Sequence, residues 1–202
     1  MTTEGLDEKT IDRDPIRQFQ TWLNEAFAAK LPLAEAMTLA TATPDGKPSA
    51  RMVLLKQVDH DGFVFYTNYN SAKARQLDAN PYAALVFFWV QFDRQVRVEG
   101  SISKTSAEES RAYFSTRPRE SRIGAWASEQ SEEIANRAVL EERAVELDKQ
   151  YGGRDIDCPE HWGGYRLKPE RIEFWKSRIG RLHDRILYQR EGDSWTIIRL
   201  AP

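Results

Sequence analysis

The amino-acid sequence predicts an α+β fold, in which an antiparallel sheet or barrel is surrounded by helices. Apolar runs with strand character are consecutive and are separated by hairpin signals, Pro-Asp-Gly at 44–46 and His-Asp-Gly at 60–62. Segments with helical spacing lie between blocks of strands and do not alternate with single strands. The chain has 202 residues and no internal repeat or linker-like tract. We therefore expect a flexible arm over residues 1–13 and one domain over residues 14–202.

The first half of the chain carries clear helix and strand signals. Asp14 is an N-cap residue before a proline at the first helical position, which predicts a helix that ends near Lys30. Its apolar stripe at helical spacing is Ile16, Phe19, Leu23 and Phe27. Three strand-like runs follow over residues 36–68, and Ser71 is expected to cap a short helix that closes before Asn80.

The second half contains further strands and helices. In order, these are strands over residues 83–92 and 94–104, helices over 105–114, 119–128 and 131–151, and strands over 163–176, 181–190 and 194–200. Thr105 and Ser106, with Glu108 and Glu109, offer two overlapping capping boxes for the first of these helices. The longer helix is predicted to begin at Ser131 and to end at Gly152, a residue type that favours helix C-termini.

Composition excludes several classes of function. The formal net charge is −2, which argues against nucleic acid or an anionic membrane as a partner. One cysteine precludes an internal disulfide and, with an acidic N-terminus unlike a targeting peptide, suggests a cytoplasmic protein. No apolar run approaches the ~20 residues that cross a bilayer. Phosphate-loop motifs are absent and the three histidines are far apart, so we expect no metal site.

Arginine supplies 20 of the 29 basic residues, which in a near-neutral chain favours local anion sites. Three groups of basic and hydroxyl residues are candidates. They are Arg51 with Lys56, Thr67 with Ser71 and Lys73, and Tyr113 with Arg117 and Ser121. Each group taken alone is better explained by helix caps and surface ion pairs, so the residues by themselves do not identify a reaction.

The run IEFWKSRIGRLHDR closely resembles the signature of the pyridoxamine 5′-phosphate oxidase family, including its spacing from Trp175 to Arg181. Six further segments resemble that family in the same order along the chain. They are RMVLLK, VFYTN, RQVRVEG, YFSTRPRESRIGAWASEQS, HWGGYR and IIRLAP. The resemblance covers nearly the whole chain, from about Asp14 to Pro202.

This resemblance implies an FMN-binding split β-barrel that forms a homodimer, with FMN at the subunit interface. It also implies an enzyme that oxidises pyridoxamine or pyridoxine 5′-phosphate to pyridoxal 5′-phosphate, passes electrons to O₂ and releases H₂O₂. Two other interpretations stay open: a split-barrel flavin reductase with a different substrate, and a non-catalytic carrier of FMN or pyridoxal phosphate. The presence of Arg117, Ser121, Arg181 and His183 favours the oxidase, because neither alternative requires all four.

Matching positions in the family imply the site residues. The FMN contacts are Arg51, Met52, Val53, Leu54, Leu55, Lys56, Tyr66, Thr67, Lys73, Gln95, Gln130, Ser131, Trp175 and Arg185. The substrate contacts are Lys56, Tyr113, Arg117, Ser121, Arg181, Leu182 and His183, and the catalytic residues are Arg181, His183 and Arg185. Two departures from the family pattern are Ala72, where a basic residue commonly precedes Lys73, and the lack of a basic stretch before Gly5.

The run RLHDRILYQR is predicted to be a strand, and this determines which of its side chains share a face of the sheet. Alternate residues of a strand face opposite ways, so Arg181, His183 and Arg185 would share one wall of the site. Leu182 and Asp184 would face the other way, and Asp184 would pair with a neighbouring strand. We expect Arg185 to stabilise negative charge on the flavin ring, and Arg181 and His183 to orient the substrate.

Overall fold

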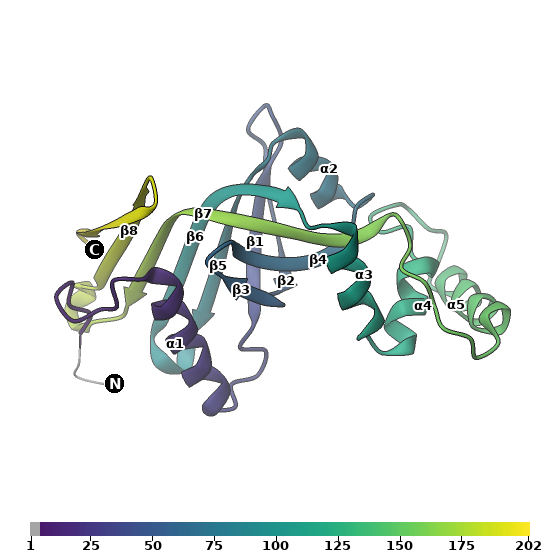
Figure 1. Cartoon of the computed structure of the whole chain (residues 1–202), viewed down its shortest axis with the longest axis horizontal. Helices are drawn as coiled ribbons and strands as arrows, with labels where there is room; N and C mark the ends of the chain where they lie inside the picture. The colour runs from purple at the N-terminus through teal and green to yellow at the C-terminus, as the bar shows by residue number, and fades with distance from the viewer. Residues whose placement is uncertain (1–4) are drawn as a thin grey trace.

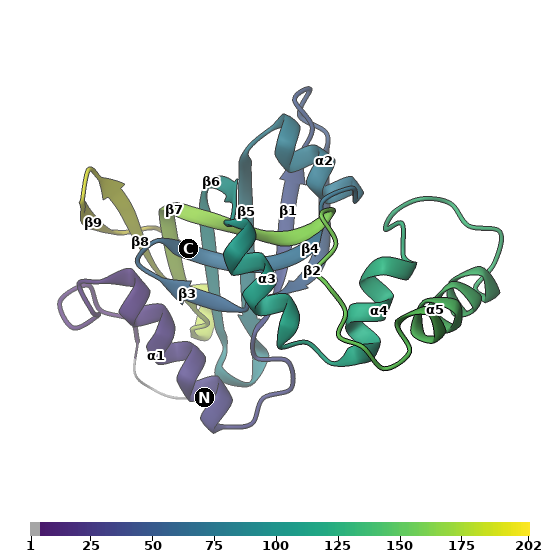
Figure 2. The ribbon, with the colours of Figure 1, turned by 45° about the vertical axis from the view of Figure 1, so that its right-hand side comes forward.

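A nine-stranded antiparallel sheet forms the centre of the computed structural model, which describes residues 5–202 (Figure 1). Its strands are β1 (Ala36–Ala42), β2 (Pro48–Leu54), β3 (Gln57–Asp59), β4 (Gly62–Asn68), β5 (Tyr82–Trp89), β6 (Arg94–Lys104), β7 (Trp162–Lys176), β8 (Asp184–Glu191) and β9 (Ser194–Arg199). Their order in space is β2-β1-β5-β6-β7-β4-β3, and β8 and β9 extend the sheet from β7. The sheet curls into a half-barrel (Figures 1 and 2), which confirms the antiparallel α+β prediction.

Five α-helices of the described residues surround this sheet. They are α1 (Pro15–Ala28), α2 (Ala72–Ala79), α3 (Ala107–Ser115), α4 (Arg119–Ala127) and α5 (Ala138–Tyr151). The side chains of Asp14 and Ser71 accept hydrogen bonds from the first backbone N–H groups of α1 and α2, and Ser106 with Glu109 forms the predicted capping box of α3. Gly152, in the left-handed conformation, ends α5. Within residues 5–202, none of the helices combines the length and apolarity needed to cross a membrane.

The predicted start of the longer helix at Ser131 is wrong, because α5 begins at Ala138. Ser131 has a φ of 78°, a left-handed conformation that differs from the extended backbone of an N-cap residue. Its hydroxyl accepts a hydrogen bond of 3.1 Å from the backbone N–H of Ala72, the first residue of α2. Ser131 therefore satisfies a donor at the start of a different helix from the one that the sequence pattern assigned to it.

Three smaller differences concern the ends of elements. Residues 36–68 hold four strands and not three, because β2 ends at Leu54 before the short strand β3 begins. The predicted strand over residues 83–92 stops at Trp89 and continues as the 3₁₀ turn η1 (Val90–Phe92). Phe27, in the last turn of α1, is 48% exposed and lies outside the core, although its spacing matches the apolar stripe.

The main core lies between α1 and the sheet. Phe19 of α1 is fully buried, and its ring meets Phe63 of β4 and Phe87 of β5 edge-on, at centroid distances of 4.9 and 4.8 Å. Trp22, one turn along, packs edge-on against Phe174 of β7 at 5.1 Å. Such ring pairs add about 0.5–1.5 kcal/mol each beyond the burial of their area. This packing fixes the strands from which the candidate site is built.

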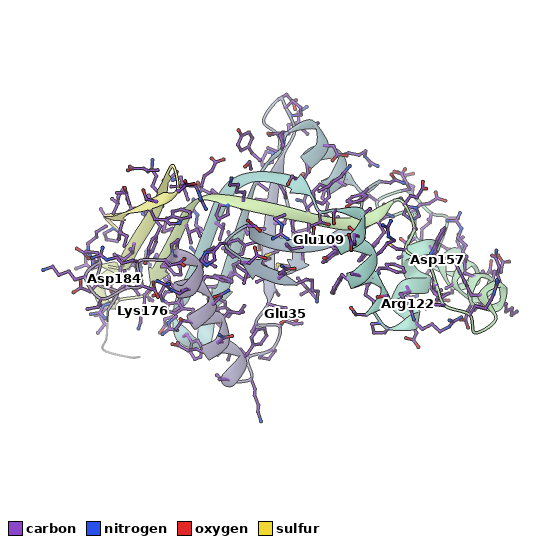
Figure 3. The ribbon with its side chains drawn as sticks, viewed as in Figure 1. Glu35, Glu109, Arg122, Asp157, Lys176 and Asp184 are labelled. Atoms are coloured by element: carbon purple, nitrogen blue, oxygen red, sulfur yellow. The ribbon has the colours of Figure 1, made fainter. Side chains whose placement is uncertain are left out.

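A smaller apolar cluster holds α3 and α4 against the start of β7. Its buried members are Phe114, Ile123, Ile156 and Trp162. In both views α4 and α5 project from one end of the sheet, and β8 lies at the other end (Figures 1 and 2). Figure 3 shows the same division, with Arg122 and Asp157 at the α4 end and with Lys176 and Asp184, which pair in register, at the β8 end.

The segment before α1 lies against the last two strands. The Tyr188 hydroxyl of β8 donates to the carbonyl oxygen of Asp12 at 2.6 Å, and Arg199 of β9 pairs with Glu8, also at 2.6 Å. Residues 1–4 of the predicted arm lie outside the described residues. The division of the chain into an arm and a domain stays a prediction.

Candidate active site

A cavity of about 700 Å³ is lined by residues of β2, β4, β7, α2, α3 and α4, and its volume is typical of small-molecule sites. It brings together many of the predicted site residues. They are Met52, Val53, Leu54, Lys56, Tyr66, Thr67, Lys73, Tyr113, Arg117, Ser121 and Gln130. The three groups of basic and hydroxyl residues found in the sequence therefore all contribute to one cavity.

The end of β2 divides its side chains between the cavity and the interior. Met52, Leu54 and Lys56 line the cavity and are exposed. Arg51 has the opposite parity, and its guanidinium donates to oxygens of β1 and α2 outside the cavity lining. Leu55 is buried in the main core, so its side chain does not reach the cavity. The two basic residues of this run, Arg51 and Lys56, therefore lie on different sides.

Among the described residues, the cations Lys73 and Arg51 donate hydrogen bonds only to uncharged acceptors. The Lys73 Nζ donates to Thr67 Oγ1 at 3.1 Å, to Ser71 Oγ at 3.2 Å and to Gln130 Oε1 at 2.6 Å. The Arg51 guanidinium donates to one carbonyl oxygen and two side-chain oxygens. Burial, followed by the nearby Arg51 charge, lowers the pKa of Lys73 to about 8. Two cations without a carboxylate partner suit an anionic group such as a phosphate.

Gln130 and Ser131 lie on a segment that folds back onto the start of α2. The Gln130 side chain contacts Lys73, as described above, and the Ser131 hydroxyl accepts from the N–H of Ala72. The Asn68 side chain also donates to a carbonyl oxygen of this segment at 3.3 Å. Backbone N–H groups at a helix N-terminus favour anions, so this segment lies beside the part of the site that is best suited to phosphate.

Stacked aromatic rings form one wall of the cavity. Tyr66 and Tyr113 stack at 4.1 Å, and Trp162 lies nearly parallel to Tyr66 at 5.4 Å. The Arg117 guanidinium lies over the Trp162 ring at 4.6 Å, and its Nη1 is buried with no hydrogen-bond partner among the described residues. A buried donor of this kind requires an acceptor, which an anionic ligand would supply. Trp162 was not predicted as a site residue, although the quoted segment HWGGYR contains it.

The other predicted residues of the sheet form a separate row. Gln95 of β6 pairs in register with Trp175 of β7, which pairs with Arg185 of β8. Directly opposed residues of antiparallel strands share a face of the sheet, so the three side chains lie side by side. None of these three residues lines the cavity. Within one chain, the fold therefore separates the predicted residues that line the cavity from the row of Gln95, Trp175 and Arg185.

The prediction that RLHDR begins a strand is wrong, because β8 starts at Asp184. Gly180 and Arg181 have φ values of 71° and 61°, so the chain turns at η2 (Ile179–Arg181) and cannot be extended there. Arg181 is exposed, and Leu182 is 72% exposed. Strand alternation consequently gives no common wall to Arg181, His183 and the residues of β8.

His183 and Arg185 are each held by their neighbours. The Nδ1 of His183 accepts from the backbone N–H of Arg178 at 3.1 Å, and the imidazole lies 4.7 Å from the Trp175 ring. A neutral imidazole with this contact carries its proton on Nε2. Arg185 donates from Nε and Nη2 to the two carboxylate oxygens of buried Glu173, at 2.8 and 3.0 Å, and this hydrogen-bonded pairing raises the pKa of Arg185.

Asp184 makes the contact with a neighbouring strand that the sequence predicts. Its carboxylate pairs with Arg199 of β9 at 3.0 Å and with Arg178 at 3.6 Å. It also accepts from the backbone N–H of Leu6 at 3.1 Å. These contacts join three segments of the chain, so the side chain has a structural role.

The half-barrel and a cavity lined by cationic and hydroxyl-bearing side chains suit the binding of a small anionic molecule. Residues 23–151 match the family described as pyridoxamine 5′-phosphate oxidase. Residues 162–202 match the pyridoxine 5′-phosphate oxidase C-terminal dimerisation region. The chain belongs to the pyridoxamine 5′-phosphate oxidase family.

Relatives with similar sequences extend over almost the whole chain. The pyridoxine/pyridoxamine 5′-phosphate oxidase of Rubrobacter xylanophilus is 58% identical over 201 residues, which cover 100% of this chain and 93% of that protein. The enzyme of the same name from Paraburkholderia phytofirmans is 59% identical over 200 residues, which cover 98% of this chain and 93% of that protein. These names support an oxidoreductase of this family.

Two solved structures share the fold. PhzG from Burkholderia lata 383, solved in complex with tetrahydrophenazine-1-carboxylic acid, has a TM-score of 0.92 at 30% identity, with 98% of each chain covered. A pyridoxamine 5′-phosphate oxidase-related, FMN-binding protein from Nostoc punctiforme has a TM-score of 0.75 at 20% identity, with 95% of this chain and 100% of that chain covered. The second likeness concerns the fold alone, and the split-barrel prediction is confirmed.

Proposed function

We propose that the protein is an FMN-dependent oxidase that converts pyridoxamine 5′-phosphate and pyridoxine 5′-phosphate to pyridoxal 5′-phosphate, with O₂ as the electron acceptor and H₂O₂ as a product. The presence of two separate cationic groups carries this proposal. In the first group, Lys73 lines the cavity and Arg51 lies near it, outside the lining. The second group is Arg117 and Lys56, which both line the cavity. A phosphorylated cofactor and a phosphorylated substrate together require two such groups.

The residues of the first group fit FMN. Lys73, Arg51 and the N–H groups at the start of α2 would hold its phosphate, because their present acceptors carry no charge. Met52 and Leu54 offer exposed apolar surface on the cavity wall for the flavin rings. When bound, FMN supplies the two-electron chemistry between the substrate and O₂. The protein contributes binding, orientation and exclusion of water.

The second group fits the phosphate of the substrate. The buried Nη1 of Arg117 has no partner among the described residues, and Lys56, Tyr113 and Ser121 line the same cavity. Hydrogen bonds between cationic donors and phosphate oxygens are about twice as strong as neutral ones. We infer that this group holds the phosphate end of the substrate and leaves the other end for the residues that act on the reacting carbon.

We infer that a homodimer joins the two groups of site residues. Residues 162–202, matched as a dimerisation region, carry Trp175, His183 and Arg185. Phe88 and Val90, at the end of β5, are each 59% exposed, and an obligate dimer interface would cover such apolar side chains. The row on β6, β7 and β8 of one protomer would then complete the cavity of its partner. Sedimentation at micromolar concentration tests this point, and a stable monomer saturated with FMN would exclude it.

The decisive experiment is to purify the protein, record its visible spectrum and measure H₂O₂ release with each phosphorylated vitamer, pyridoxamine 5′-phosphate and pyridoxine 5′-phosphate. We expect a flavin spectrum and peroxide formation that depends on the vitamer. Arg117→Ala is the matched variant, because it should keep its flavin and lose substrate affinity. A bound flavin that is reduced by neither vitamer would favour a carrier or a reductase with another substrate.

A further inference from the structure

An ion pair also holds the segment after α4 on α2. We name residues 128–132 the strap. Arg75 of α2 donates from Nη1 to the Glu132 carboxylate of the strap at 3.0 Å, and the same nitrogen donates to the carbonyl oxygen of Asn70. The side chains of Arg75 and Glu132 are 55% and 54% exposed. One guanidinium therefore joins the loop before α2, α2 itself and the strap.

We propose that Arg75 and Glu132 are positioning residues of the cofactor site: their ion pair sets the strap so that Gln130 and Ser131 meet the phosphate end of FMN. This inference rests on the proposed function. Ser131 has a φ of 78°, an uncommon conformation for a residue other than glycine, so the strap needs contacts that hold it. Glu132 is the next residue, and it forms an ion pair with Arg75 of α2, in addition to the hydrogen bond that Lys73 of α2 donates to Gln130.

Simple electrostatics and positioning predict opposite results for Glu132→Gln. If Glu132 acted only through its charge, its removal would tighten FMN binding, because a carboxylate near the phosphate site repels an anion. If Glu132 positions the strap, its removal weakens FMN binding, because Gln130 and Ser131 lose their fixed places. Arg75→Gln should weaken binding in either case, so the sign of the Glu132 effect is the critical observation.

The expected effect is modest because both side chains are half exposed. Exposed ion pairs of this kind change an equilibrium by about 1.5- to fivefold, and we expect Glu132→Gln to weaken FMN binding within that range. The double variant Arg75→Glu with Glu132→Arg reverses the pair without changing the net charge, so it should recover most of the affinity. Riboflavin, which lacks the phosphate, should bind all variants alike.

The experiment titrates the cofactor-free protein with FMN and with riboflavin and follows the quenching of flavin fluorescence. Glu129→Gln is the control, since it removes the same charge from the strap but breaks a pair with Arg143 of α5 at 3.4 Å. Unchanged melting temperatures would separate positioning from loss of folding. Weaker FMN binding in Glu132→Gln only, with recovery in the reversed pair, supports the proposal.

Two other outcomes overturn it. Unchanged or tighter FMN binding in Glu132→Gln would refute the positioning role and leave the proposed function intact. Equal weakening in Glu132→Gln and Glu129→Gln would refute the specific role of the pair with Arg75. A wild-type protein that fails to bind FMN would instead refute the proposed function itself, so the two failures are distinguishable.

Discussion

Lys73 should make FMN binding depend on pH above neutrality. Burial and the Arg51 charge lower its pKa to about 8 in the protein without ligand. A phosphate beside the ammonium group favours the charged form and raises that pKa again. Binding of FMN above pH 8 therefore requires the uptake of a proton, and affinity is lost as the pH rises. Below pH 7 the lysine is already protonated, so this contribution to affinity is fully present there.

The size of the effect follows from the two pKa values. At pH 9 about nine tenths of the Lys73 side chains in the free protein have lost their proton, given a pKa of about 8. If the bound phosphate restores the ordinary lysine value of 10.5, the dissociation constant at pH 9 should exceed that at pH 7 by about tenfold, or about 1.4 kcal/mol. Burial raises the pKa of Tyr66, so its phenol stays neutral over this range.

Fluorescence titration of the cofactor-free protein with FMN, between pH 7 and pH 9.5 at constant ionic strength, measures this slope. Riboflavin gives the pH dependence of the flavin rings without the phosphate. Lys73→Arg should remove the slope, because arginine stays protonated throughout. Lys73→Met should bind FMN weakly at every pH. A slope that persists in Lys73→Arg, or a wild-type affinity that is constant up to pH 9.5, would show that Lys73 does not pair with the phosphate.

Three further predictions concern the other parts of the site. Arg117→Ala removes a charge-assisted contact worth roughly 1.5–3 kcal/mol, so substrate affinity should fall about ten- to a hundredfold while the flavin content stays unchanged. Titration of the FMN-loaded protein measures this affinity; loss of the yellow colour would mean that Arg117 belongs to the FMN phosphate site and not to the substrate phosphate site. Ala72→Arg should tighten FMN binding at low salt, with a gain that shrinks as salt is added; an unchanged dissociation constant would show that Lys73 and Arg51 suffice. Arg181→Ala should slow single-turnover flavin reduction without lowering the melting temperature. Asp184→Ala should lower the melting temperature, because it breaks part-buried and exposed contacts with Leu6 and Arg199 worth about 0.5–1.5 kcal/mol each; the reverse result would contradict both assignments.

Elements with local chemical signals could be predicted from the sequence. The starts of α1, α2 and α3 follow from Asp14, Ser71 and Ser106, because each side chain satisfies backbone donors within its own helix. Hairpin turns and strand alternation likewise involve only neighbouring residues. The cavity residues lie on helices, strands and loops that are far apart in the chain. Their meeting was predicted from the family resemblance and not from local signals.

Two failures arose where a distant segment determines the conformation. Serine is a residue type typical of N-caps, but the Ser131 hydroxyl accepts a hydrogen bond from a backbone N–H of α2. The residues next to Ser131 in the sequence do not reveal this contact, because α2 lies far away along the chain. The turn at Gly180 and Arg181 interrupts a run that is rich in strand-forming residues. The contact from outside the run is that of Asp184 with Arg199 of β9. The hydrogen bond from the N–H of Arg178 to the His183 ring is local and spans the turn itself.

The division of the candidate site into two groups has a physical explanation in the sheet. Gln95, Trp175 and Arg185 form one row across three strands, so a rigid sheet presents them together and the distances among them are set by strand spacing. The cavity, by contrast, is lined by α2, α3, α4, the ends of β2 and β4 and the first residue of β7, Trp162, whereas Trp175 of the row lies near the other end of β7. A single chain cannot bring the two groups closer without unfolding the sheet, whereas a second copy can do so by rigid docking. We therefore regard dimerisation as a requirement of the proposed chemistry, and expect dilution below the dimer dissociation constant to abolish flavin reduction while leaving the secondary structure unchanged.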